Sequence, residues 1–262
     1  MKVEYGGKTV VVTGAAGAIG SALAEAFAKN GANVAVCARN KEKGTALAGK
    51  IKSEGGIAEW FNLDVTDRKA VGDAAKDIYE KFGGIHVLVN NAGVNVGPDD
   101  RGPVHEFKDE KWDWIKSVDL DGVYNCSKAF IPYIIKSGGG NILNISSIVG
   151  VVPLRNQCAF AACKAAVVNL TKAMAIELAP DNIRVNVICP GSILFEGTKA
   201  LFYADPEKTE RILVNIPQHR PGSGDDISNA ALYMASDADA GYVTGAVLVV
   251  DGGWTSGFAR DF

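Results

Sequence analysis

The strongest constraint on the fold is a regular alternation of short β-branched runs with longer alanine-rich segments of helical periodicity. Runs that are apolar on both faces are typical of a parallel sheet with helices on each side. Strands are expected at 8–13, 33–38, 57–61, 86–90, 140–145, 184–188 and 246–250. Helices are expected at 19–29, 41–53, 67–82, 112–135, 157–178 and 225–236. The pattern predicts an α/β fold, a doubly wound Rossmann-like sheet that binds its ligand beyond the carboxyl ends of the strands.

One domain is expected over residues 1–262, because no linker rich in proline, serine or charge divides the chain and no repeat is visible. Residues 195–221 interrupt the alternation with a long aromatic stretch of mixed charge. Long insertions at this edge of a sheet are usually functional, so we expect a substrate lid. A pair of surface helices that covers apolar surface is the alternative.

Composition excludes several classes of protein. The formal net charge of −3 argues against a nucleic-acid partner. No run of about 18 apolar residues is present, and the start has no signal-peptide pattern, so we expect no membrane association. Five cysteines without a Cys-x-x-Cys pair and three scattered histidines predict neither a disulfide framework nor a metal site, and this cysteine usage favours a reducing cytoplasm.

A glycine-rich string, TGAAGAIG at 13–20, joins the first expected strand to the first expected helix. Gly14 permits a tight turn, and small residues after it let the backbone approach a pyrophosphate. The amino terminus of the helix offers unpaired N–H groups to phosphates. We therefore expect a dinucleotide to contact Gly14, Gly17, Ile19 and Gly20, although a turn into any helix could use such a string.

The end of the second strand discriminates between cofactors. An acidic residue there would bond the ribose hydroxyls of NAD, but the strand ends in Ala38, Arg39 and Asn40. A guanidinium can pair with a 2′-phosphate, so Arg39 and Asn40 predict NADP(H). A solvated loop arginine is the alternative interpretation.

The order of seven motifs resembles the compact single-domain branch of the short-chain dehydrogenase/reductase family over nearly the whole chain. The motifs are TGAAGAIG (13–20), LDVTD (63–67), NNAG (90–93), NISS (144–147), AFAACK (159–164), RVNVICPG (184–191) and VDGG (250–253). The resemblance implies that Asp64, with Val65 beside it, contacts the adenine. It implies that Asn91, Ala92 and Gly93 lie under the adenosine ribose. It also implies that the turn of Pro190, Gly191 and the backbone of Ile193 holds the nicotinamide carboxamide.

The resemblance also implies three catalytic positions. In the family a serine after the fifth strand polarises the substrate carbonyl, a tyrosine exchanges the proton, and a lysine four residues later bonds the nicotinamide ribose and lowers the tyrosine pKa. Ser147 and Lys164 stand at the matching spacings from position 160. Ser146 is the competing serine, but alternation along the strand would point it the other way.

Position 160 departs from the family, because it is Phe160 and has no proton to exchange. Losing a general acid–base typically costs ~10²–10⁴ in rate. Three explanations stay open. The chain is a tyrosine-to-phenylalanine variant that holds substrate without turnover, a natural enzyme whose proton comes from a water held by Lys164 and a carboxylate, or an NADP(H)-binding protein that does not catalyse.

Asp119 bears on the second explanation, because the family often has asparagine at this point of VDLDG (118–122). If its side chain turns inward, it could hold a water together with Lys164, which resembles the family's dienoyl-CoA reductases. The alternative is an aspartate inside a helix that bonds to local backbone.

The expected function is NADP(H)-dependent interconversion of an alcohol and a ketone, with a sugar, polyol or keto acid as the small-molecule substrate. The helices around 112–135 and 157–178 carry more apolar residues than one buried stripe needs. A partner would bury the second face, so a homotetramer is expected.

Overall fold

The computed structural model describes residues 4–195, 199 and 203–257. One parallel seven-stranded sheet runs in the order β3-β2-β1-β4-β5-β6-β7, which confirms the doubly wound α/β fold. Its strands are β1 (Thr9–Thr13), β2 (Asn33–Cys37), β3 (Ile57–Phe61), β4 (Val87–Asn90), β5 (Gly140–Ile145), β6 (Ile183–Pro190) and β7 (Val247–Val250). The strand order reverses between β1 and β4, so a ligand crevice is expected at the carboxyl ends of these two strands.

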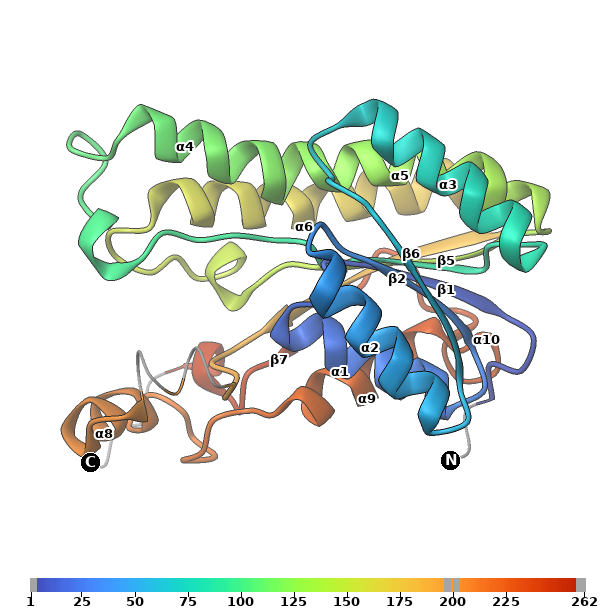
Figure 1. The fold of residues 1–262 in the computed structure, drawn as a ribbon. Coiled ribbons are helices and arrows are strands. Elements are labelled where there is room, and N and C mark those ends of the chain that lie inside the picture. The colour runs from blue at the N-terminus through green and yellow to red at the C-terminus, as the bar shows by residue number, and fades with distance from the viewer. Residues whose placement is uncertain (1–3, 196–198, 200–202, 258–262) are drawn as a thin grey trace.

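Helices cover both faces of the sheet (Figure 1). One face carries α3 (Arg68–Phe82), α4 (Asp109–Lys116), α5 (Gly122–Lys136) and α6 (Cys158–Leu178). The other carries α1 (Ala18–Lys29), α2 (Lys41–Ser53), α9 (Gly224–Ala235) and the short α10 (Asp237–Ala240), while α8 (Pro206–Leu213) stands apart from the sheet.

The central strand β1 shows why the sheet needs both layers. All five of its residues are buried. Val10 and Val12 belong to the apolar cluster beneath α1 and α9, whereas Val11 belongs to the cluster beneath α3 and α5. Successive side chains of a strand point to opposite faces, so a strand that is apolar throughout must be covered twice.

The largest difference from the expected elements lies in the helix predicted at 112–135. The structure begins it at Asp109 and interrupts it with a π-helical turn, η2 (Ser117–Asp121), between α4 and α5. Such turns insert one residue into an α-helix and are frequent at functional sites. Of the lid expected at 195–221, residues 195, 199 and 203–221 are described; they contain α8, which has no buried side chain, and the buried Ile216.

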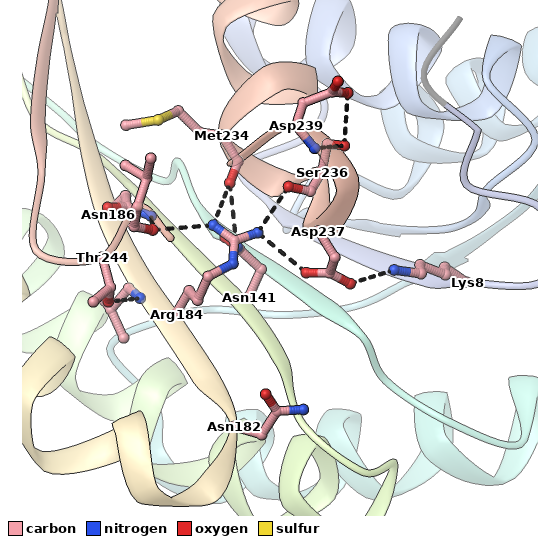
Figure 2. A network of polar contacts seen from close by, with 12 residues as sticks. Lys8, Asn141, Asn182, Arg184, Asn186, Met234, Ser236, Asp237, Asp239 and Thr244 are labelled. Atoms are coloured by element: carbon pink, nitrogen blue, oxygen red, sulfur yellow. Dashed lines mark hydrogen bonds and ion pairs between the residues drawn. The ribbon is translucent and has the colours of Figure 1, made fainter. Parts of the chain in front are cut away.

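A polar network holds the amino-terminal edge of the sheet, away from the carboxyl ends (Figure 2). The Arg184 guanidinium of β6 donates to the carbonyls of Met234 and Ser236 at 2.9 and 3.2 Å, and lies 3.2 Å from the Asp237 carboxylate. Asp237 in turn pairs with Lys8 at 2.6 Å. The network therefore joins β6, the end of α9 and the segment before β1.

Of the helices in the described ranges, only the segment Cys158–Asp181 is long and apolar enough to cross a membrane by length and composition. In the fold, α6 packs against β6 and against the short 3₁₀ helix η3 (Ile148–Gly150). Its Val167 is fully buried with Val187 of β6. The apolar character of α6 is thus used in part within the domain.

Candidate active site

A cleft of about 1000 Å³ opens at the carboxyl ends of the strands. It spans the switch point between β1 and β4, the usual place for a ligand in such a sheet. Most of the residues singled out in the sequence line it together. They are Gly14, Gly17, Ile19, Gly20, Arg39, Asn40, Asp64, Val65, Asn91, Ala92, Gly93, Asp119, Phe160, Lys164, Gly191 and Ile193.

The glycine turn leaves the amino terminus of α1 open toward this cleft. Gly14 has φ +62°, and a Cβ there would lie 2.8 Å from the Ala92 Cα, so only glycine fits. Gly17 precedes α1 and provides no side-chain cap, and the first turn of α1 has no acidic residue. The first N–H groups and the positive end of the helix dipole are therefore available to an anion.

The floor of the cleft is held by bonds between the ends of β1 and β4. The Asn91 side chain donates to the Thr13 carbonyl at 2.9 Å. The Thr13 hydroxyl accepts from the backbone N–H groups of Asn91 and Ala92 at 3.0 and 3.1 Å. These bonds keep the NNAG segment against the glycine turn.

A basic rim closes the cleft beside the end of β2. Arg39 Nη1 lies 3.7 Å from Asp64 Oδ2, and the Arg39 side chain is 64% exposed. Burial alone would raise the pKa of Asp64, but hydrogen bonds from Thr66 and the Arg39 charge outweigh it and hold that pKa below its usual value. Lys43 also lines the cleft, and its backbone N–H donates to the Asn40 side chain that caps α2. Sequence reasoning missed Lys43. Its place in the first turn of the helix expected at 41–53, close to Arg39 in the sequence, was the available signal.

The Asp119 side chain turns inward from the π-helical turn and pairs with Lys164. Asp119 Oδ1 lies 2.8 Å from Lys164 Nζ, and both side chains are almost completely buried. Asp119 Oδ2 accepts from the Val94 N–H at 2.9 Å, and Lys164 Nζ donates to the Ile145 carbonyl at 3.3 Å. The alternative of an aspartate that bonds only to its local backbone is therefore wrong.

Two neighbours pack directly against this ion pair. The ring centroid of Phe160 lies 5.5 Å from Lys164 Nζ, which places the ammonium over the aromatic face. A Cβ on Gly93 would lie 2.9 Å from Asp119 Oδ1 and 3.3 Å from Lys164 Nζ. The glycine of NNAG thus makes room for the two charges.

The two serines after β5 have different surroundings. Ser146 lines the cleft and is buried, and its hydroxyl donates to the Lys164 carbonyl at 2.8 Å. Ser147 lies outside the cleft lining and caps η3 (Ile148–Gly150), where its oxygen accepts from the Val149 N–H at 3.2 Å. Accepting this bond leaves the Ser147 hydroxyl hydrogen available to donate, whereas the Ser146 hydrogen is already used.

The remaining residues to place are the proline–glycine turn after β6 and a residue that the sequence analysis missed. Pro190 ends β6 and does not line the cleft, unlike Gly191 after it. Asn95 lines the cleft, and its side chain donates to Gln157 at 2.8 Å. Sequence reasoning missed Asn95, whose position two residues after NNAG was the available signal.

Comparisons with known proteins agree with this geometry. The chain is 39% identical to a 3-oxoacyl-(acyl-carrier-protein) reductase of Thermotoga maritima, over 97% of this chain and 99% of the relative. A family model described as enoyl-(acyl carrier protein) reductase matches residues 14–255. The chain belongs to the short-chain dehydrogenase/reductase family. It is an oxidoreductase of that family, whose members use NAD(P).

Other members of the short-chain dehydrogenase/reductase family differ in what they act on. The chain is 37% identical to a 2,5-dichloro-2,5-cyclohexadiene-1,4-diol dehydrogenase of Sphingobium indicum, over 98% of this chain and 100% of the relative. A solved gluconate 5-dehydrogenase of Burkholderia cenocepacia, in complex with NADP and tartrate, superposes with a TM-score of 0.91. It is 33% identical, and 98% of each chain is covered.

Proposed function

We propose that this chain binds NADP(H) and interconverts an alcohol and a ketone on a small polar substrate. The observation that carries the proposal is a single cleft that brings the open amino terminus of α1 together with Lys164 and Phe160. When bound, the nicotinamide cofactor would supply or accept the hydride. The chain itself would bind and orient both reactants.

The residues of the cleft fit a dinucleotide. The glycine turn leaves no side chain between the backbone and a pyrophosphate, and Gly14 tolerates no Cβ. Arg39 and Lys43 place two cations at the rim where a 2′-phosphate would lie, which supports NADP(H) over NAD(H). The NADP complex of the gluconate 5-dehydrogenase adds support from a structural relative.

Each residue near Lys164 has a proposed role in the reaction. Lys164 would bind the nicotinamide ribose, and the free hydroxyl hydrogen of Ser147 would polarise the substrate oxygen. Phe160 cannot move a proton, so we expect slow turnover unless a phenol is restored at this position. The Asn95–Gln157 amide pair adds polar groups near the cleft, which favours a sugar, polyol or keto acid as substrate.

A water-mediated reaction is the second candidate. The buried pair of Asp119 and Lys164, at 2.8 Å, supports it because the two charges could hold a water in place of the phenol. The proton would then reach the substrate oxygen through that water.

We also propose that the protein is a cytoplasmic homotetramer. The surface of α4 and α5 exposes Trp112, Trp114 and Tyr124, each about two-fifths exposed. Ile176 on α6 is 79% exposed. A partner subunit would bury these side chains.

The experiment that tests the proposed function compares the chain with its Phe160→Tyr variant. NADPH oxidation is followed with a panel of ketones, sugars and keto acids, and the affinity for NADPH is measured for both proteins. We expect equal NADPH affinity and much faster turnover by the variant. Equal turnover would favour the water-mediated reaction, and binding without turnover by either protein would indicate a non-catalytic NADP(H)-binding protein.

A further inference from the structure

We infer that Asp119 is a positioning residue that supplies the negative charge for Lys164 in a chain with no phenol at position 160. The two departures from the family pattern, Phe160 and Asp119, meet on the same ammonium. They are therefore one coupled change: the Asp119 carboxylate neutralises the charge of the Lys164 ammonium, and the Phe160 ring packs against that ammonium. The consequences for turnover rest on the proposed function, whereas the charge coupling does not.

Because Lys164 and Asp119 are both buried, each charge needs an opposite charge beside it. The side chains of Lys164 and Asp119 are only 5% and 0% exposed, and an isolated charge at this depth would be strongly unfavourable. In the described ranges, Asp119 is the only carboxylate that pairs with Lys164. The other contacts of the ammonium are neutral, namely the Ile145 carbonyl and the Phe160 ring.

The position of the ring explains what the carboxylate would do to a phenol. Phe160 precedes Lys164 by one helical turn, its ring centroid lies 5.5 Å from the ammonium, and both residues line one cleft with Asp119, so a phenol on this ring would lie in the field of both charges. The ammonium would lower the pKa of such a phenol, and the Asp119 carboxylate would raise it. Asp119 therefore opposes the activation that the lysine would otherwise provide, and restoring the phenol alone restores only part of its acid–base function.

The other titratable groups around the pair do not carry a net charge that could replace either partner. Burial raises the pKa of the Cys163 thiol to about 11, and the Asp119 charge adds to this effect. Burial also raises the pKa of Cys189. Lys116 and Asp121 pair with each other at 2.7 Å. The field at position 160 thus comes mainly from Lys164 and Asp119.

The test is the titration of a phenol introduced at position 160, with and without the carboxylate. Four proteins are compared without cofactor: the original chain, Phe160→Tyr, Asp119→Asn, and the double variant. Tyrosinate absorbance is measured against pH, and each phenylalanine protein is subtracted from its matched tyrosine variant, which cancels the seven native tyrosines. We expect the introduced phenol to titrate about one unit or more lower in the double variant than in Phe160→Tyr.

The pH profile of alcohol oxidation gives a second measurement on the same proteins. Its acidic limb reports the phenolate, so we expect it to move to lower pH by a similar amount in the double variant. Asp119→Glu in the Phe160→Tyr background keeps the charge and should leave the phenol near its position in Phe160→Tyr. Asp119→Ser replaces Asp119→Asn if the amide variant does not fold, as judged by circular dichroism.

The outcomes separate the inference from the proposed function. If the pKa of the introduced phenol differs by less than about 0.3 unit between Phe160→Tyr and the double variant, the inference is overturned, whatever the turnover. A shifted phenol in proteins that reduce no substrate supports the inference and contradicts the proposed function. Turnover that rises in Phe160→Tyr without any effect of Asp119→Asn on the phenol supports the proposed function alone.

Discussion

Replacing Arg39 with alanine should weaken NADP(H) binding selectively. A hydrogen bond to a charged group contributes about 1.5–3 kcal/mol, and a 2′-phosphate would receive such bonds from this guanidinium. Arg39 must first leave Asp64, but that contact is 3.7 Å long and the Arg39 side chain is 64% exposed, so it contributes at most about 1 kcal/mol. The net loss of about 0.5–3 kcal/mol has a midpoint of about 1.7 kcal/mol, which corresponds to a factor of roughly 20 in the dissociation constant.

The assay is the fluorescence of bound NADPH and NADH, titrated with the original chain and with Arg39→Ala. NADH has no 2′-phosphate, so its dissociation constant should change by less than about threefold. Arg211→Ala is the matched control, because Arg211 is an exposed arginine on α8 and does not line the cleft. Equal weakening of both cofactors, or tighter binding of NADH than NADPH by the original chain, would refute the assignment of Arg39 to the 2′-phosphate.

The remaining predictions concern a close packing contact, polar contacts at the edge of the sheet, and the assembly. Gly93→Ala should lower the melting temperature and NADPH affinity, because its Cβ would lie 2.9 Å from Asp119 Oδ1, whereas Gly97→Ala, with open space around its Cβ, should change neither. Arg184→Met should destabilise the fold by about 1.5–3 kcal/mol in urea unfolding, because it removes the charged donor that the carbonyls of Met234 and Ser236 share and a partner of Asp237. Lys8→Met, which breaks an ion pair with an exposed partner, should cost less than about 1 kcal/mol. Sedimentation at micromolar concentration should show a tetramer, and a monomer would contradict the proposed assembly.

Most of the fold could be predicted because its strands are short, apolar on both faces and separated by clear helix stops. Gly83, for example, directly follows the helix expected at 67–82 and ends α3 in the left-handed conformation that favours glycine. The π-helical turn could not be predicted in this way. Hydrophobic periodicity averages over several turns, so one extra residue between Ser117 and Asp121 does not change the pattern enough to be seen.

The candidate site was predictable where a motif determines backbone geometry and less so where side chains meet. Gly14 and Asn91 line the cleft as expected. Gly14 follows β1 and Asn91 follows β4, and these two parallel strands pair directly, so their carboxyl ends lie side by side. The inward turn of Asp119 depends on the depth of Lys164 in a different helix, which no local pattern reports. Lys43 was missed because the cofactor contacts expected in this segment end at Asn40, although its place in the first turn of the helix expected at 41–53 was an available signal.

The most direct test of the account is the rate of NADPH oxidation by the original chain and by Phe160→Tyr, at saturating NADPH and with the same ketone. The account predicts that both proteins bind NADPH equally and that the variant is faster by about 10², the lower end of the usual contribution of a general acid, because Asp119 opposes part of the activation. Equal rates in two proteins that bind NADPH equally would contradict it, because the proton would then reach the substrate without a phenol at position 160.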